Sequence, residues 1–194
     1  MGSADIAARL QDAADTFAKL TVAESVHELT RAAELVADAV LNDRCLFVFG
    51  NGGSAADAAH LAAELVGRCT TERRPLPAVA LTESGSLMTA LANDYGYEQV
   101  FARQIESLGK PGDVAMGLST SGRSANVIAG LRAARDRGMT TIGMTGEGTH
   151  DMSEMVDCLL IAPSTRTPRI QECHHLWAHL IAEHIDLRVA KAQR

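Results

Sequence analysis

Residues 113–124 read DVAMGLSTSGRS, an apolar run followed by a turn rich in hydroxyl groups. The apolar run predicts a buried strand, and a helical pattern begins at Asn126. The turn between them contains Ser119, Thr120, Ser121 and Ser124. Because a helix N-terminus offers free backbone N–H groups and a favourable dipole, this turn suits a bound phosphate. The alternative is an ordinary turn capped by serine.

Short apolar runs recur along the chain and alternate with helical patterns. They lie at residues 45–49, 78–81, 113–118, 140–144 and 158–162. Runs that are apolar on both faces and separated by helices are typical of a parallel sheet covered on both sides. We therefore expect an α/β fold, a doubly wound five-stranded parallel sheet flanked by helices, with ligands beyond the carboxyl ends of the strands.

Helices are expected at both ends of this sheet region. Residues 1–43 carry apolar positions at helical spacing and predict two helices, a helical extension. A long helix is expected from about residue 168 to 189, with Pro168 suited to its first turn. With no linker or repeat, residues 1–194 are expected to form one domain, whose α/β core and last helix span 44–194.

Composition excludes several classes of function. The net charge of −6 and pI near 5.6 argue against broad contact with nucleic acid. No apolar stretch approaches the roughly 20 residues of a membrane span, and the start of the chain lacks a signal-peptide pattern, so a cytoplasmic protein is expected. Four cysteines, without metal-type spacing, are interpreted as reduced, packed thiols: Cys45, Cys69, Cys158 and Cys173.

A second polar loop follows the first predicted strand. It reads Gly50-Asn51-Gly52-Gly53-Ser54, and a helix is expected from about Ala55. The glycines permit a tight turn, although such a loop alone is a weak signal. Since both polar loops follow strands of one sheet, we expect them to face a common crevice.

Two helices carry candidate metal ligands. His60 and Glu64 are spaced i, i+4 and share a helix face, a spacing that suits two ligands of one zinc ion. The alternative is a solvated helix face on which Arg68 forms a salt bridge with Glu64. In the last helix Gln171, His175 and His179 follow at successive i+4 steps. Two other histidines of this helix, His174 and His184, are interpreted as packing or solvated residues. Arg166 and Arg169 before it either reach a phosphate or lie in a solvated loop.

These motifs together resemble the phosphoheptose isomerase branch of the sugar-isomerase (SIS) domain proteins. The residues that carry the resemblance are Gly50 to Ser54 with Asp57, His60 and Glu64; Asn93-Asp94-Tyr95-Gly96; Ser119-Thr120-Ser121-Gly122 with Ser124 and Asn126; and Ile170-Gln171-Glu172 with His179. The resemblance covers nearly the whole chain. Departures after Glu172 and around Arg73 affect only local loop shape.

The resemblance implies a site and an assembly. It implies one Zn²⁺ per subunit, bound by His60, Glu64, Gln171 and His179, with Glu64 as the base and His179 as the acid. Substrate contacts are implied for Asn51, Gly52, Gly53, Ser54, Glu64, Asn93, Asp94, Ser119, Thr120, Ser121, Ser124 and Gln171. It further implies a homotetramer with active sites at subunit interfaces, assembled with help from the N-terminal helices. His175 does not match the family's ligand pattern and is interpreted as packing or outer-shell.

The implied reaction converts sedoheptulose 7-phosphate to D-glycero-D-manno-heptose 7-phosphate through an enediol, the first step of ADP- or GDP-heptose biosynthesis. The alternative is a non-catalytic SIS-domain protein that associates with the bacterial replication initiator; such proteins keep the loops but lack the full acid, base and metal set. This chain has Glu64 and His179, which favours the enzyme. A third class, a sugar-phosphate-sensing regulatory domain, would normally be joined to a DNA-binding segment.

Overall fold

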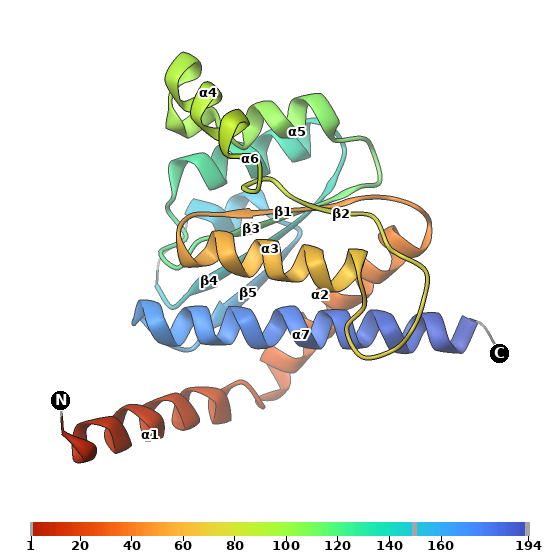
Figure 1. The fold of residues 1–194 in the computed structure, drawn as a ribbon. Helices are drawn as coiled ribbons and strands as arrows, with labels where there is room; N and C mark the ends of the chain where they lie inside the picture. Colours follow the sequence, from red (N-terminus) through yellow and green to blue (C-terminus); the bar gives the residue numbers. More distant parts are fainter. Residues whose placement is uncertain (1, 149–150, 193–194) are drawn as a thin grey trace.

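A computed structural model describes residues 2–148 and 151–192 (Figure 1). Residues 1, 149–150 and 193–194 of the expected 1–194 unit lie outside the described residues. The helices are α1 (Ser3–Lys19), α2 (Ala23–Leu41), α3 (Gly53–Val66), α4 (Gly85–Tyr95), α5 (Ala102–Leu108), α6 (Ala125–Asp136) and α7 (Thr167–Ala192), with 3₁₀ turns η1 (Tyr97–Gln99) and η2 (Asp151–Met155). The strands are β1 (Leu46–Gly50), β2 (Ala78–Ala80), β3 (Val114–Leu118), β4 (Thr140–Gly146) and β5 (Cys158–Ala162).

The described strands form one five-stranded sheet in the order β2-β1-β3-β4-β5. Every pair is parallel; Val48 of β1, for example, lies between Ala80 of β2 and Met116 of β3. The chain places β2 on one side of β1 and then β3 on the other, so the direction of strand addition reverses between β1 and β3. In a doubly wound sheet, ligands bind in the crevice beyond the carboxyl ends of the strands at this reversal. The predicted fold class is confirmed. The strand boundaries differ slightly, since β1 begins one residue later than predicted and β4 continues to Gly146.

Helices cover both faces of the sheet (Figure 1). Helices α2, α3 and α7 pack on one face, and α5 and α6 pack on the other. A hydrophobic core lies on each face of the sheet. Because successive side chains of a strand point to opposite faces, Val48 of β1 packs in the core under α2, α3 and α7, and Phe47 and Phe49 pack in the core under α5 and α6. The ring of Phe49 lies 5.1 Å from that of Phe101. Burial on both faces explains why the strands are continuously apolar in sequence.

Helix α7 begins at Thr167, so Pro168 lies in its first turn as predicted. It is a 26-residue helix and buries Trp177, Ile181 and Ile185 in the core. It therefore extends beyond the predicted end near residue 189. Across the described residues, the structure contains no helix with the length and apolar character that a membrane span requires.

Helix α1 lies away from the sheet and contacts α7 (Figure 1). Asp12 of α1 pairs with Arg166 and Arg169. Arg166 lies in the exposed loop before α7, as one of the two alternatives predicted, whereas Arg169 is buried in the first turn of α7. Helix α1 leaves Ile6 and Leu10 exposed. Exposed apolar side chains along one side of an amphipathic helix are unfavourable in water and often mark an interaction surface.

The four cysteines are free. Burial raises the pKa of Cys158 to about 12 and that of Cys173 to about 11, so both thiols stay protonated at neutral pH. The interpretation of these residues as packed, unreactive thiols agrees with their environment.

Candidate active site

The loop after β1 connects the sheet to α3 and touches α7. Gly52 has a φ of +56°, a conformation that favours glycine. A Cβ atom at Gly53 would lie 2.4 Å from Nε2 of Gln171, so only glycine lets the amide of α7 approach this backbone. Helix α3 begins at Gly53, two residues before the predicted start, and Gln171 lies against its first turn.

An amide pair joins the two polar loops. Asn51 Nδ2 donates to Asn126 Oδ1 at 2.9 Å, and Asn126 Nδ2 donates back to Asn51 Oδ1 at 2.8 Å. The hydroxyl group of Tyr97 also donates to Asn51 Oδ1, at 2.9 Å. The loops after β1 and β3 therefore meet at the reversal point of the sheet, as the sequence predicted.

The hydroxyl-rich turn after β3 is held together from within. Ser119 is buried, and its Oγ lies 2.8 Å from Ser124 Oγ and 3.4 Å from Ser121 Oγ. Thr120 and Ser121 line a cavity of about 220 Å³, together with Arg123, Glu147, Gly148, Thr165, Thr167 and Ile170. This cavity borders the N-terminal turn of α7, where the helix dipole favours an anion.

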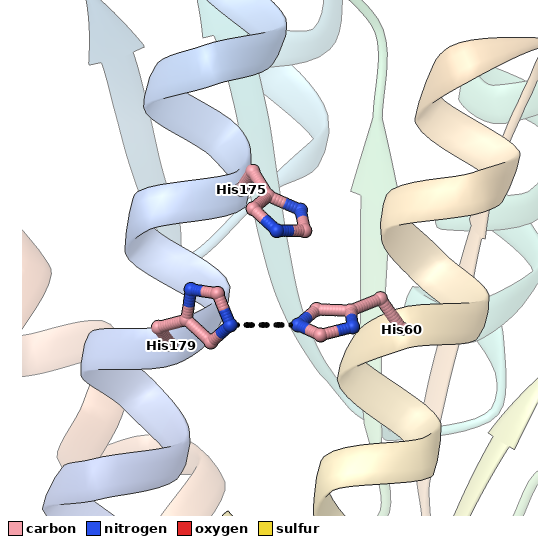
Figure 2. A group of neighbouring side chains, drawn as sticks. All are labelled: His60, His175 and His179. Atoms are coloured by element: carbon pink, nitrogen blue, oxygen red, sulfur yellow. Dashed lines mark hydrogen bonds between the residues drawn. The ribbon is translucent and has the colours of Figure 1, made fainter.

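The contact between α3 and α7 brings three predicted ligands together. His60 Nε2 of α3 lies 2.9 Å from His179 Nε2 of α7 (Figure 2) and 3.7 Å from Glu64 Oε1. Imidazole nitrogens and a carboxylate are ordinary zinc donors, so the chemistry of these three residues fits the implied metal. The fourth predicted ligand, Gln171, lines the adjoining cavity of about 550 Å³ with His179.

His175 also lies in this cluster, although sequence reasoning leaves it outside the ligand set. Its ring stacks on that of His60 with centroids 4.5 Å apart, and its Nδ1 lies 3.0 Å from Asp57 Oδ1. One nitrogen from each ring of His60, His175 and His179 lies within 4.8 Å of the others. The signal was the i, i+4 spacing of His175 with Gln171 and His179, which places all three on one helix face.

The surroundings of His60 favour its neutral form. Burial lowers the pKa of His60, the neighbouring His175 lowers it further, and Glu64 opposes both effects. Burial also raises the pKa of Asp57, while its hydrogen bond with His175 acts in the other direction. A neutral imidazole is the form that binds a metal ion.

Other predicted residues differ in their exposure and partners. Asn93 and Asp94 are exposed on α4, where the amide of the first donates to the carboxylate of the second at 2.8 Å. Ser54 is buried against Gly50. Arg68 pairs with Glu72 at 3.5 Å, so the alternative pairing with Glu64 is wrong.

A buried ion pair fixes the other end of α3. Arg73 Nε donates to Asp186 Oδ1 at 2.6 Å, and both side chains are buried. The backbone N–H groups of Thr70 and Thr71 donate to Asp186 Oδ2, each at 2.8 Å. Arg73 also donates to the backbone carbonyl of Glu64 at 2.9 Å, so it satisfies an acceptor in the last turn of α3 and ties that turn to α7.

Comparison with known proteins agrees with this fold and site. A family model described as the SIS domain matches residues 10–146, which defines the class. A phosphoheptose isomerase of Aliarcobacter butzleri is 50% identical over 173 residues, 89% of this chain and 90% of that protein. The chain therefore belongs to the phosphoheptose isomerase family.

Solved structures of the same family superpose closely on this chain. The phosphoheptose isomerase of Neisseria gonorrhoeae is 41% identical, with a TM-score of 0.88 over 94% of this chain and 97% of that one. The enzyme of Francisella tularensis is 32% identical, with a TM-score of 0.91 over 96% and 100%. These matches give no support to the alternative of a protein that associates with the replication initiator.

Proposed function

We propose that the protein converts sedoheptulose 7-phosphate to D-glycero-D-manno-heptose 7-phosphate through an enediol, the first step of heptose biosynthesis. One observation carries the proposal: His60 of α3 lies 2.9 Å from His179 of α7 and 3.7 Å from Glu64, and α7 also lines the cavity of the hydroxyl-rich turn. A relative that is 50% identical to this chain carries the name phosphoheptose isomerase, which supports the same substrate for this protein.

The reaction requires a base and an acid near C1 and C2 of the sugar. The Glu64 carboxylate takes a proton from C1, and His179 gives a proton to the C2 oxygen, which yields the enediol. Loss of the proton on the C1 oxygen and protonation of C2 then complete the aldose. Positioned groups of this kind typically contribute about 10²- to 10⁴-fold each.

The same helices would hold a zinc ion. We assign it to His60, Glu64, Gln171 and His179, one ion per subunit; the first, second and fourth of these converge in the structure. When bound, the ion would act as a Lewis acid toward negative charge on a substrate oxygen.

The phosphate lies far from the reacting carbons, so its site acts by positioning. We assign it to the hydroxyl groups of the turn after β3, whose cavity borders the first turn of α7. Gln171, in that same part of α7, lines the neighbouring cavity with His179. Binding energy gained at the phosphate can thereby orient the other end of the substrate.

We further propose a cytoplasmic homotetramer with active sites at subunit interfaces. The exposed apolar side chains Ile6 and Leu10 of α1 suit burial against another copy. Phe17 of the same helix lines the cavity beside His175 and His179, so a neighbouring subunit seated on α1 would lie close to the site. Four free thiols suit a reducing compartment. Light scattering should give a mass near four times 20.6 kDa.

The direct test is incubation of the purified protein with sedoheptulose 7-phosphate, followed by NMR of the sugar. We expect the aldose signal to appear, to be lost after treatment with a chelator, and to return on addition of zinc. A metal-loaded, folded protein that leaves the ketose unchanged would contradict the proposed reaction.

A further inference from the structure

Tyr97 contacts the polar loop after β1 from a segment distant in the chain. It lies in η1, directly after Gly96, whose φ of +89° favours glycine and ends α4. Tyr97 is 54% exposed, yet its hydroxyl group lies 2.9 Å from Asn51 Oδ1. Packing in the core does not explain an exposed tyrosine whose hydroxyl group is held by a residue of the substrate loop.

We propose that Tyr97 is a positioning residue for the proposed reaction: its hydroxyl group fixes the amide of Asn51, so that Asn51 meets the sugar as a hydrogen-bond donor. The inference deepens the proposed function and rests on it for the identity of the substrate. Tyr97 acts through Asn51 and need not touch the sugar itself.

One backbone group sets the direction of every hydrogen bond in this network. Val127 N–H donates to the side chain of Asn126 at 3.0 Å, and since a backbone N–H can only donate, the atom that accepts is the amide oxygen Oδ1. That oxygen also accepts from Asn51 Nδ2, while Asn126 Nδ2 donates to Asn51 Oδ1. The oxygen of the Asn51 amide therefore faces Tyr97, and the hydroxyl group of Tyr97 is the donor.

The network determines what Asn51 has left for the substrate. Its Oδ1 accepts from both Tyr97 and Asn126, which uses both lone pairs of the oxygen. One N–H of its Nδ2 donates to Asn126, and the second N–H has no partner in the described part of the chain. Asn51 is partly exposed, so this N–H is available to a sugar oxygen. An amide that is already held in place loses less freedom on binding than a mobile one, which favours affinity.

The first test is Tyr97→Phe, which removes the hydroxyl group and keeps the ring. Tyr95→Phe is the matched control, because Tyr95 is 50% exposed and contacts Arg103 through its ring, which phenylalanine retains. For Tyr97→Phe we expect KM for sedoheptulose 7-phosphate to rise about three- to tenfold, as the loss of one neutral hydrogen bond predicts, with kcat within about twofold of the wild type. The control should keep both constants, and urea unfolding should give the same midpoint for all three proteins.

A double-mutant cycle shows whether Tyr97 acts through Asn51. Because coupled residues are not additive, adding Tyr97→Phe to Asn51→Ala should change KM by less than about twofold. NMR gives a second measurement that needs neither substrate nor the Asn51 variant: the side-chain amide signal of Asn51 should move in Tyr97→Phe and stay in place in Tyr95→Phe. An unmoved signal, or an equal rise in KM with and without Asn51, would overturn the inference.

The same measurements separate this inference from the proposed function. An active wild type with unchanged KM in Tyr97→Phe refutes only the role of Tyr97. A wild type that binds the sugar phosphate without converting it refutes only the reaction, and calorimetry of Tyr97→Phe then decides the role of Tyr97, with the same three- to tenfold loss expected in affinity. A wild type that neither binds nor converts the sugar phosphate refutes both.

Discussion

Helices α3 and α7 meet at two places, one with a buried ion pair and one with polar side chains exposed to a cavity. At one end, Arg73 and Asp186 are buried, and the carboxylate of Asp186 accepts hydrogen bonds from Arg73 and from the segment just before it in the chain. At the other end, His60 and His179 face each other in a half-exposed cluster beside a cavity of about 550 Å³. The closed end holds the helices in register, and the open end presents reactive groups. Stability and chemistry should therefore respond to different substitutions along the same helix pair.

The largest expected effect comes from the open end. Glu64→Gln removes the proposed base while it preserves shape, so kcat should fall by about 10²- to 10⁴-fold with sugar phosphate still bound. His179→Ala should act in the same way. Steady-state kinetics and binding calorimetry provide the measurements. Glu72→Gln is the control, since this carboxylate is 88% exposed. Near-normal turnover by Glu64→Gln would show that the base lies elsewhere.

The closed end should respond in stability. Asp186→Asn leaves the Arg73 charge buried without its partner, which typically costs about 3–5 kcal/mol of unfolding free energy. Urea unfolding measures the loss. Asp43→Asn breaks the exposed pair with Arg74 and should cost less than about 1 kcal/mol. If both variants lose equally little, the two ends of the helix pair do not differ as described.

The phosphate cradle should give a smaller, separate effect. Ser121→Ala and Ser124→Ala each remove one hydroxyl group that we assign to the phosphate. Because hydrogen bonds to a charged group contribute about 1.5–3 kcal/mol, KM should rise by roughly tenfold or more while kcat stays close to that of the wild type. Kinetics with varied substrate concentration separate the two constants. A loss confined to kcat would place these hydroxyl groups at the reacting carbons.

Acid should loosen the closed end. Burial raises the pKa of Asp186, but hydrogen bonds from Thr71, Thr70 and Arg73 outweigh burial and hold that pKa below 3.8. A carboxylate with a lowered folded pKa contributes stability that is complete above its unfolded value and is lost as the pH falls below it. Urea unfolding from pH 5 downward should therefore show a loss below about 3.8 that is absent in Asp186→Asn. Equal acid sensitivity in the two proteins would contradict this assignment.

The sheet was predictable because its strands are short and apolar on both faces. Since the carboxyl ends of parallel strands lie at one edge, the meeting of the loops after β1 and β3 was predictable, although the amide pair of Asn51 and Asn126 within them was not. The spacing of His60 and Glu64, and that of Gln171 and His179, predicts that each pair shares one face of its helix, without any knowledge of how the two helices pack.

His175 and Arg73 could not be placed from sequence alone. Spacing assigns His175 to a face of α7, but only the packing of α7 on α3 shows that this face meets His60. Arg73 lies in a polar stretch with no pattern of burial, and its partner Asp186 is 113 residues away. Both residues depend on the register between two helices distant in the chain, which local periodicity does not determine.

In our proposal the open end of the α3–α7 pair is the metal site of an isomerase. Anomalous diffraction at the zinc edge from crystals of the zinc-loaded protein tests it most directly. We expect one peak per subunit about 2.0–2.1 Å from both His60 Nε2 and His179 Nε2, the usual zinc–imidazole distance. A zinc peak elsewhere, with these two nitrogens still hydrogen-bonded to each other, would contradict the account.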